Sequence, residues 1–167
     1  MSQRPSSISS SHSRLNSGLN SPAKKFFAAQ IPSCVQTNKD SSSNNIDEWT
    51  YKSNRRSSIS FSQIWVQGIV VLVSTDGNDM LIDDGTGIVY VTGLTKLVKN
   101  ILISKGMYVM VAGQLKSTGS SSTPQGDQPY PTIRILKFSD LSKNLSTDAL
   151  WMLEVVDAQM NERKTNA

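Results

Sequence analysis

Residues 64–92 read IWVQGIVVLVSTDGNDMLIDDGTGIVYVT, and this stretch decides the fold class. It holds a long β-branched run at 64–73 and shorter apolar runs at 80–82 and 88–92. Short β-branched runs separated by tight turns predict three consecutive strands. The separating segments are Asp76-Gly77-Asn78 and Asp83-Asp84-Gly85-Thr86-Gly87, both of which are strong turn signals.

The segments that follow extend the same pattern. We predict a short helix at 96–103, strands at 107–115 and 132–138 with a flexible Ser-, Gly- and Pro-rich loop at 117–131 between them, and a closing helix at 150–160. Three strands, a helix, two strands and a helix follow the order of a five-stranded Greek-key barrel of the OB type. The predicted fold class is therefore all-β with short helices, an OB-fold barrel with a C-terminal helix. The strand pattern leaves an open sandwich as the alternative.

The first third of the chain differs in composition from the rest. Its start is dominated by Ser and has no apolar periodicity, so it cannot bury enough surface to offset the entropy of ordering. Two apolar islands follow, residues 24–35 with Phe26-Phe27 and the short segment Trp49-Thr50-Tyr51, and such islands often dock as an extra strand. Residues 53–58 resemble the tail again. We therefore divide the chain into a disordered tail at 1–23, a partly ordered extension at 24–58 and an OB domain at 59–167.

Charge and cysteine content narrow the class of protein. Residues 1–58 hold eight Lys or Arg against three Asp or Glu, a balance of +5, whereas residues 59–167 hold nine against ten, a balance of −1. Cys34 and His12 are the only residues of their kinds, so a disulfide within the chain and a Cys/His metal site lack their partners. No apolar run reaches the roughly 18 residues of a membrane helix. We expect a soluble protein of a reducing compartment, with no cofactor and no membrane contact.

The predicted barrel lacks the features of a DNA-binding OB fold, which holds single strands on aromatic side chains and a basic groove. Residues 57–95 contain no Lys or Arg, and the second and third strands offer only Tyr90. Asp83 and Asp84 lie in a tight turn away from any His, Cys or Glu cluster, which favours a turn role over catalysis. We expect a non-enzymatic protein whose direct DNA binding is weak or absent. The alternative is a single-stranded-DNA-binding OB-fold protein.

The strands carry more apolar surface than one barrel interior can hide. Those at 64–73 and 107–115 are apolar on both faces, whereas a small barrel needs one apolar face per strand. The excess predicts that the closing helix, the Phe26-Phe27 segment and another protein cover the outer surface. In the closing helix we expect one stripe to pack on the barrel and Trp151 and Val155 to form a second buried face against a partner. The alternative for Trp151 and Val155 is simple core packing. The stripe consists of Ala149, Met152, Leu153, Val156 and Met160.

Four motifs stand out along residues 64–160: Trp65-Val66-Gln67-Gly68, Gly106-Met107-Tyr108-Val109-Met110-Val111, Lys137-Phe138-Ser139-Asp140-Leu141-Ser142 and Trp151-Met152-Leu153-Glu154-Val155. Their order and approximate spacing resemble the RecQ-mediated genome instability protein 2 family, and Ser21 to Gln30 resembles the family's leading strand more loosely. The resemblance implies a non-enzymatic subunit that pairs with an OB-fold partner resembling RecQ-mediated genome instability protein 1, with C-terminal helices packed together as in the core of replication protein A. Through that partner, the family joins topoisomerase III and a Bloom-type RecQ helicase, dissolves double Holliday junctions and limits crossovers. We therefore expect a scaffold subunit in the nucleus.

The predicted functional residues come from the extension, the fifth strand and the closing helix. Lys137 interrupts the apolar alternation of its strand, and the family motif keeps Lys there, so a partner contact and a simple strand end are both open. Ser21-Pro22 resembles a proline-directed kinase site, which makes Ser21 a candidate for phosphorylation. The predicted partner interface consists of Phe26, Phe27, Lys137, Leu150, Trp151, Leu153, Val155 and Val156.

Overall fold

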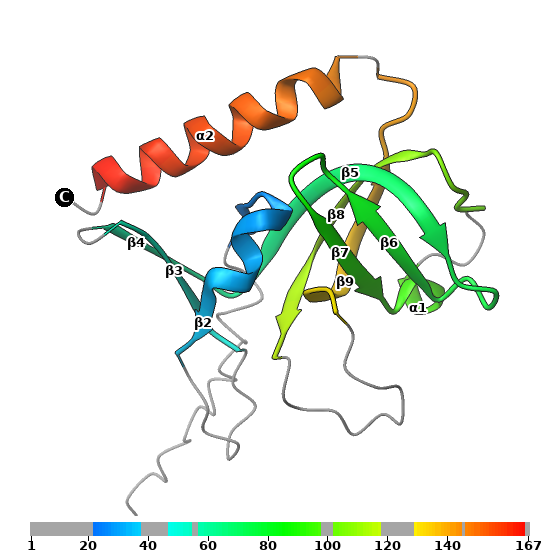
Figure 1. Cartoon of the computed structure of the whole chain (residues 1–167), viewed down its shortest axis with the longest axis horizontal. Helices are drawn as coiled ribbons and strands as arrows, with labels where there is room; N and C mark the ends of the chain where they lie inside the picture. Colours follow the sequence, from blue (N-terminus) through cyan, green and yellow to red (C-terminus); the bar gives the residue numbers. More distant parts are fainter. Residues whose placement is uncertain are drawn as a thin grey trace, which may run out of the picture.

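A barrel, a smaller sheet beside it and a long helix that crosses both make up the structure (Figure 1). The computed structural model describes residues 22–37, 47–54, 57–97, 102–117, 129–144 and 146–165. The described elements are, in chain order, β1 (Lys24–Lys25), the 3-10 helix η2 (Ala28–Ser33), β2 (Cys34–Gln36), β3 (Trp49–Asn54), β4 (Ser57–Phe61), β5 (Ile64–Val73), β6 (Asp79–Asp83), β7 (Ile88–Thr92), α1 (Leu94–Leu97), β8 (Tyr108–Lys116), β9 (Thr132–Asp140) and α2 (Thr147–Thr165).

Five strands close into the barrel that the sequence predicts. β5 pairs with β6 and β6 with β7, both antiparallel, as the two tight turns require. β7 then pairs parallel with β9, β9 pairs with β8, and β8 returns to β5. The closed order is therefore β5-β6-β7-β9-β8, with β8 paired again to β5. This order confirms the OB fold and excludes the open sandwich, because a sandwich would leave β5 and β8 unpaired.

Two glycines let neighbouring barrel strands approach closely. A Cβ atom at Gly68 in β5 would lie 2.4 Å from the carbonyl oxygen of Asp83 in β6. A Cβ atom at Gly113 in β8 would lie 2.2 Å from the carbonyl oxygen of Arg134 in β9. Strand register shifts next to Gly113, between Ala112 and Gly113. Both glycines therefore mark points where the sheet bends to close the barrel.

The three-stranded sheet β2-β3-β4 was not predicted as a unit. β3 and β4 pair antiparallel, which places Trp49 opposite Phe61 and Tyr51 opposite Ile59. The prediction that residues 53–58 resemble the tail is wrong for 53, 54, 57 and 58, which lie in β3 and β4. The alternation of Ile59 and Phe61 gives β4 a buried face. The predicted domain boundary between residues 58 and 59 falls inside β4, and β4 leads within two residues into β5.

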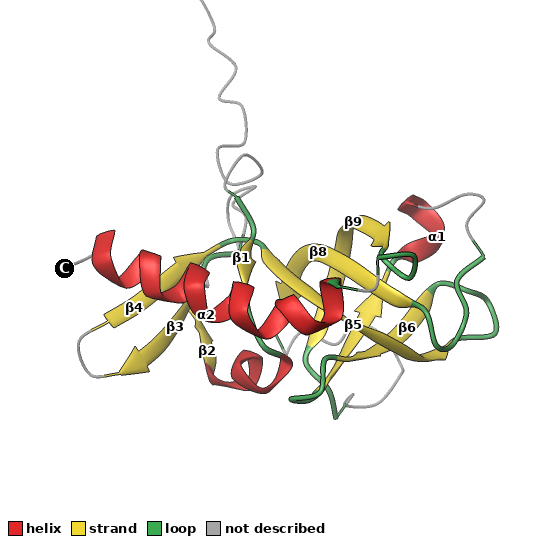
Figure 2. Cartoon of the chain, turned by 90° about the horizontal axis from the view of Figure 1, so that it is seen from above, coloured by secondary structure: helices red, strands yellow, loops and turns green. Residues whose placement is uncertain are grey.

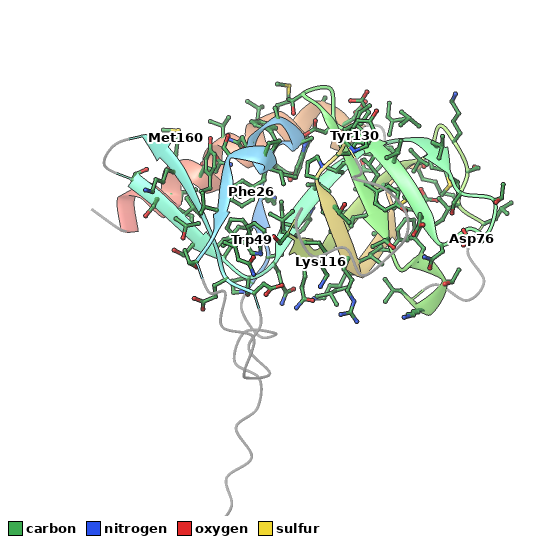
Figure 3. All side chains as sticks on the ribbon, turned by 60° about the horizontal axis from the view of Figure 1, so that its bottom comes forward. Phe26, Trp49, Asp76, Lys116, Tyr130 and Met160 are labelled. Carbon is green, nitrogen blue, oxygen red and sulfur yellow. The ribbon has the colours of Figure 1, made fainter. Side chains whose placement is uncertain are left out.

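One apolar core continues from the barrel into the space beneath the small sheet. Phe26 is fully buried, with its ring centre 4.7 Å from that of Phe61 and 5.5 Å from that of Tyr51 in an edge-on contact. The core members that the extension supplies are Phe26, Ala28, Ile31 and Trp49. The extension is therefore part of the folded core (Figure 3).

The turn between β6 and β7 holds the extension in place. An Oδ atom of Asp84 accepts hydrogen bonds from the backbone N–H of Ala28 (2.8 Å), while the Thr86 hydroxyl accepts one from Ala29 N–H (3.2 Å). The other Asp84 oxygen accepts from the N–H groups of Thr86 and Gly87 inside the turn. The predicted turn role of Asp84 is confirmed, and the same carboxylate also fixes the start of η2.

The helix after β7 begins earlier than predicted. The backbone N–H groups of Gly93 and Leu94 both donate to the carbonyl oxygen of Asn78, at 3.1 and 3.0 Å, and this starts α1 at Leu94 instead of Lys96. Residues 102 and 103 are not helical. Residues 98–101, the tail up to Ser21 and residues 118–128 of the predicted loop lie outside the described residues.

Candidate protein-interaction surface

Helix α2 lies across the small sheet and the barrel and buries one narrow row of side chains (Figure 2). Trp151 and Val155 are 2% and 0% exposed, and Gln159 is 6% exposed. These residues follow one another at intervals of four, so they lie on one line along the helix. The row faces β1, β4 and β5, the elements against which α2 packs.

Polar contacts with the extension fix the helix in register. The side-chain amides of Gln159 and Gln30 exchange two hydrogen bonds, at 2.8 and 3.1 Å, and Gln159 also donates to the carbonyl oxygen of Lys25 at 3.2 Å. Glu154 forms an ion pair with Lys25 at 2.8 Å, and Glu162 forms one with Lys24. Glu154, Ala158 and Glu162 are spaced like the buried row, so α2 is joined to β1 along two turns.

The opposite side of α2 is apolar and exposed. We name as the outer face of α2 the large apolar residues Leu150, Met152, Leu153, Val156 and Met160, which are 47%, 55%, 66%, 47% and 50% exposed. Asp157 is also exposed on this side, four residues after Leu153. A helix that covers only its own barrel needs one apolar face, so a second apolar face on the same helix is typical of a protein-binding surface.

The faces of α2 differ in part from those predicted. Sequence analysis assigned Trp151 and Val155 to a partner, and placed Leu153 and Val156 both in the stripe on the barrel and in the partner interface. In the structure Trp151 and Val155 are buried within the chain, and the stripe is exposed. The indole of Trp151 is buried between α2 and the strands. Gln159, on the same side of the helix, donates hydrogen bonds to Lys25 and Gln30 of the extension, which also turns this side inward.

The other predicted interface residues are scattered. Phe26 is a core residue, which contradicts its predicted place in a partner interface, while Phe27 is half-buried at the start of η2. Lys137 is exposed on β9, opposite Ala112 of β8, which in turn lies opposite Trp65 of β5. Lys137 thus lies on the outer wall of the barrel, in the row that leads to the seam beneath α2. Ser21 lies outside the described residues.

Sequence analysis missed Gln159, Gln30, Lys24 and Lys25 as the residues that hold α2. A signal was present, because Glu154 and Glu162 are eight residues apart, which places two acidic groups on one side of the helix, and two lysines precede Phe26. Nothing local shows that these segments meet, since Lys25 and Glu154 are 129 residues apart.

The face of β6 and β7 that would hold DNA in other OB folds carries acidic groups engaged within the protein. The carboxylate of Asp79 accepts hydrogen bonds from the hydroxyls of Tyr90 (2.6 Å) and Thr92 (2.7 Å) and from the side-chain amide of Asn78 (2.8 Å). Burial and the Asp79 carboxylate raise the pKa of Tyr90 to about 12. The ring of Tyr90 is therefore held beside a negative charge, which repels the phosphates of a nucleic acid.

Asp76 also serves a turn. Its carboxylate accepts hydrogen bonds from the Ser74 hydroxyl (2.6 Å) and the Asn78 N–H (3.0 Å), and these bonds lower the pKa of Asp76. No group of three His, Cys, Asp or Glu side chains within the described residues is arranged to hold a metal ion. Nor does any helix in the described part of the chain have the length and apolar character needed to cross a membrane.

Comparison with known proteins shows which family shares this sequence and fold. The family model of RecQ-mediated genome instability protein 2 matches residues 22–159, from β1 through the buried row of α2. The chain belongs to this family. Sequence relatives in the RecQ-mediated genome instability protein 2 family include the chicken protein, 30% identical over 60% of this chain and 68% of its own length, and the mouse protein, 29% identical over 64% of each.

A solved structure of a replication protein A heterotrimer bound to single-stranded DNA contains a chain with the same fold. That chain is 18% identical, with a TM-score of 0.58 over 85% of this chain and 98% of its own length. At that identity the likeness concerns the fold alone. The likeness covers 85% of this RecQ-mediated genome instability protein 2 family member, so it includes elements around the barrel as well as the barrel itself.

Proposed function

We propose that this protein is a non-catalytic subunit that pairs with a second OB-fold protein through the outer face of α2. The observation that carries the proposal is the exposure of Leu150, Met152, Leu153, Val156 and Met160 on a helix whose opposite face is already buried. Apolar side chains that are half exposed in the free chain gain about 25 cal/mol per Å² when a partner covers them. The helix is also held rigidly by Gln159 and two ion pairs, which lowers the entropy lost on binding.

The family supports a more specific assignment. The partner is an OB protein resembling RecQ-mediated genome instability protein 1, and through it the chain joins topoisomerase III and a Bloom-type RecQ helicase in the nucleus. The role of the subunit is to stabilise that complex, which dissolves double Holliday junctions and limits crossovers. Membership of the family and the presence of an unfilled apolar helix face support this assignment.

The test is co-expression of the full chain with the C-terminal OB domain of such a partner. We expect Leu153→Asp and Val156→Asp each to weaken the complex by about tenfold or more, because a carboxylate would be buried in an apolar interface. Both variants should keep the unfolding midpoint of the free chain, since their side chains are exposed. Val35→Asp is the matched control, as Val35 is 61% exposed but lies in β2, away from α2.

Co-purification of both helix variants with the partner at the level of the parent would contradict the proposal.

The same assay applied to Lys137→Ala and Lys137→Arg separates two roles for that residue. Loss with Ala and rescue with Arg indicates a charge contact with the partner, and full binding by both indicates a strand end. Phosphorylation of Ser21 stays a prediction, and phosphopeptide mapping in dividing cells that finds Ser21 unmodified would remove it.

A further inference from the structure

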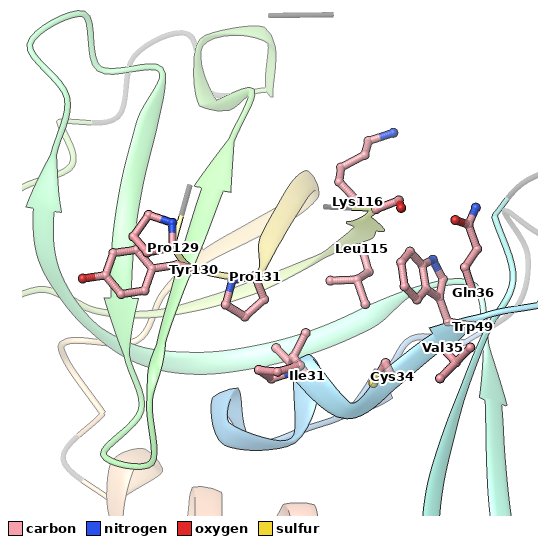
Figure 4. A pocket seen from close by; sticks show the side chains of 12 residues that line it. Ile31, Cys34, Val35, Gln36, Trp49, Leu115, Lys116, Pro129, Tyr130 and Pro131 are labelled. Carbon is pink, nitrogen blue, oxygen red and sulfur yellow. The ribbon is translucent and has the colours of Figure 1, made fainter. Parts of the chain in front are cut away.

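A groove of about 450 Å³ lies between the small sheet and the barrel, away from α2 (Figure 4). Tyr130 lies with Pro129 and Pro131 at one side of the groove, and Trp49 lies at the other, with Ile31 and Leu115 between them. This volume falls within the range of about 300–1,000 Å³ for ligand pockets. The groove is therefore large enough for several side chains of a ligand.

The side chains of the groove suit an extended apolar chain. Rings of Trp and Tyr together with proline rings form the surfaces on which proline-containing segments pack in several recognition domains. Trp49 is 6% exposed, so it forms a fixed apolar wall of the groove and not a mobile surface side chain. Burial raises the pKa of the Cys34 thiol to about 12, which keeps this wall uncharged.

One wall of the groove is the edge of a sheet. β2 pairs with β3 on one side, and among the described strands it ends the sheet order β2-β3-β4 on the other. Thr37 N–H donates to the carbonyl oxygen of Glu48 at 2.8 Å, so the main-chain groups of the preceding Gln36 point away from β3. An extended peptide beside β2 can pair with them. Val35 adds a side chain that is 61% exposed.

The charge of the side chains that line the groove favours a peptide over a nucleic acid as its ligand. Lys116 is the one charged residue among the described side chains that line the groove. A single cation attracts a carboxylate, whereas a nucleic acid needs a series of basic residues along its phosphates.

We propose that this groove binds an extended, proline-containing segment of a protein partner that carries an acidic residue. The segment adds to the edge of β2, packs its apolar side chains between Trp49 and Tyr130, and places its carboxylate near Lys116. This site is separate from the outer face of α2. It gives the subunit a second contact by which it recruits a linear peptide while α2 holds the OB partner.

The test uses a phage-displayed library of short random peptides selected on the full chain, followed by fluorescence anisotropy with the enriched peptides. We expect enriched peptides to contain proline and to be acidic. Tyr130→Ala and Val35→Asp should weaken their binding by about tenfold or more, because each removes one wall of the groove or adds a repelling charge. Lys116→Glu should abolish the preference for acidic over basic peptides.

The matched control is Leu153→Asp, because Leu153 is 66% exposed, close to the 61% of Val35, but lies on α2. It should leave peptide binding unchanged while it disrupts the OB partner, so the two proposals can fail separately. Tyr130 is half-buried at the entry of β9, and a circular dichroism spectrum like that of the parent shows that Tyr130→Ala has folded. Enriched peptides that bind Tyr130→Ala and the parent equally would overturn the proposal, as would oligothymidine that competes for the groove.

Discussion

At the scale of single residues, the barrel depends on positions where a side chain has no room. Gly113 lies where β8 and β9 shift register, and its neighbour across the strands is the backbone of Arg134, which cannot move aside as a flexible side chain can. Gly68 meets the backbone of Asp83 in the same way. Glycine is required at both positions because the backbone of the neighbouring strand leaves no room for a Cβ atom where the barrel closes.

We expect Gly113→Ala to lower the free energy of unfolding by about 1–3 kcal/mol or more, the usual cost of overpacking. Urea denaturation followed by tryptophan fluorescence measures the change. Gln114→Ala, at the next residue, is the control and should change stability by no more than about 0.5 kcal/mol, because Gln114 is half-exposed. Equal stability of Gly113→Ala and the parent would show that the strands can separate at this point.

At the scale of elements, α2 is apolar on two sides, and its polar contacts decide which side faces inward. The reciprocal amide pair of Gln159 and Gln30 is buried, and a buried amide that loses its partner retains the full cost of desolvation. The ion pairs of Glu154 and Glu162 lie at the rim of the seam, partly exposed, and therefore contribute less.

We expect Gln159→Ala to destabilise the chain by about 1–3 kcal/mol, because it leaves the amide of Gln30 and the carbonyl of Lys25 without this partner. Hydrogen exchange should then accelerate along α2 and β1 more than in β5. Met160→Ala is a neighbouring control on the outer face and should leave both measurements close to those of the parent. Unchanged exchange in α2 would mean that the buried row of Trp151 and Val155 holds the helix by itself.

At the scale of the whole molecule, the extension and the barrel share one core. Phe26, Ala28, Ile31 and Trp49 are buried against barrel residues, and Asp84 of the barrel caps the start of η2. Loss of one buried Phe costs about 3–5 kcal/mol, and a domain of this size has about 5–15 kcal/mol of stability in total. The barrel is therefore incomplete without the extension.

We expect a fragment of residues 59–167 to lack a cooperative unfolding transition, whereas a fragment of residues 22–167 should unfold like the full chain. Thermal denaturation by circular dichroism and size-exclusion chromatography compare the two. The physical reason is that a cut before residue 59 divides β4 and removes the core side chains of the extension. A monomeric, cooperatively folded fragment of 59–167 would show that the barrel is an independent unit.

The sequence by itself determined the barrel, because strand alternation and turn chemistry are local. β5 and β7 have the bounds that the sequence predicts, and Asp76 and Asp84 serve the predicted turns. Only the tertiary structure decided which face of α2 is free and how the extension packs. Both faces of α2 are apolar, so composition does not distinguish them, and the choice is made by contacts such as that of Gln159 with Lys25, which lie 134 residues apart. The absence of Lys and Arg from β5 to β7 could be read from the sequence, but the exposure of the outer face of α2 could not.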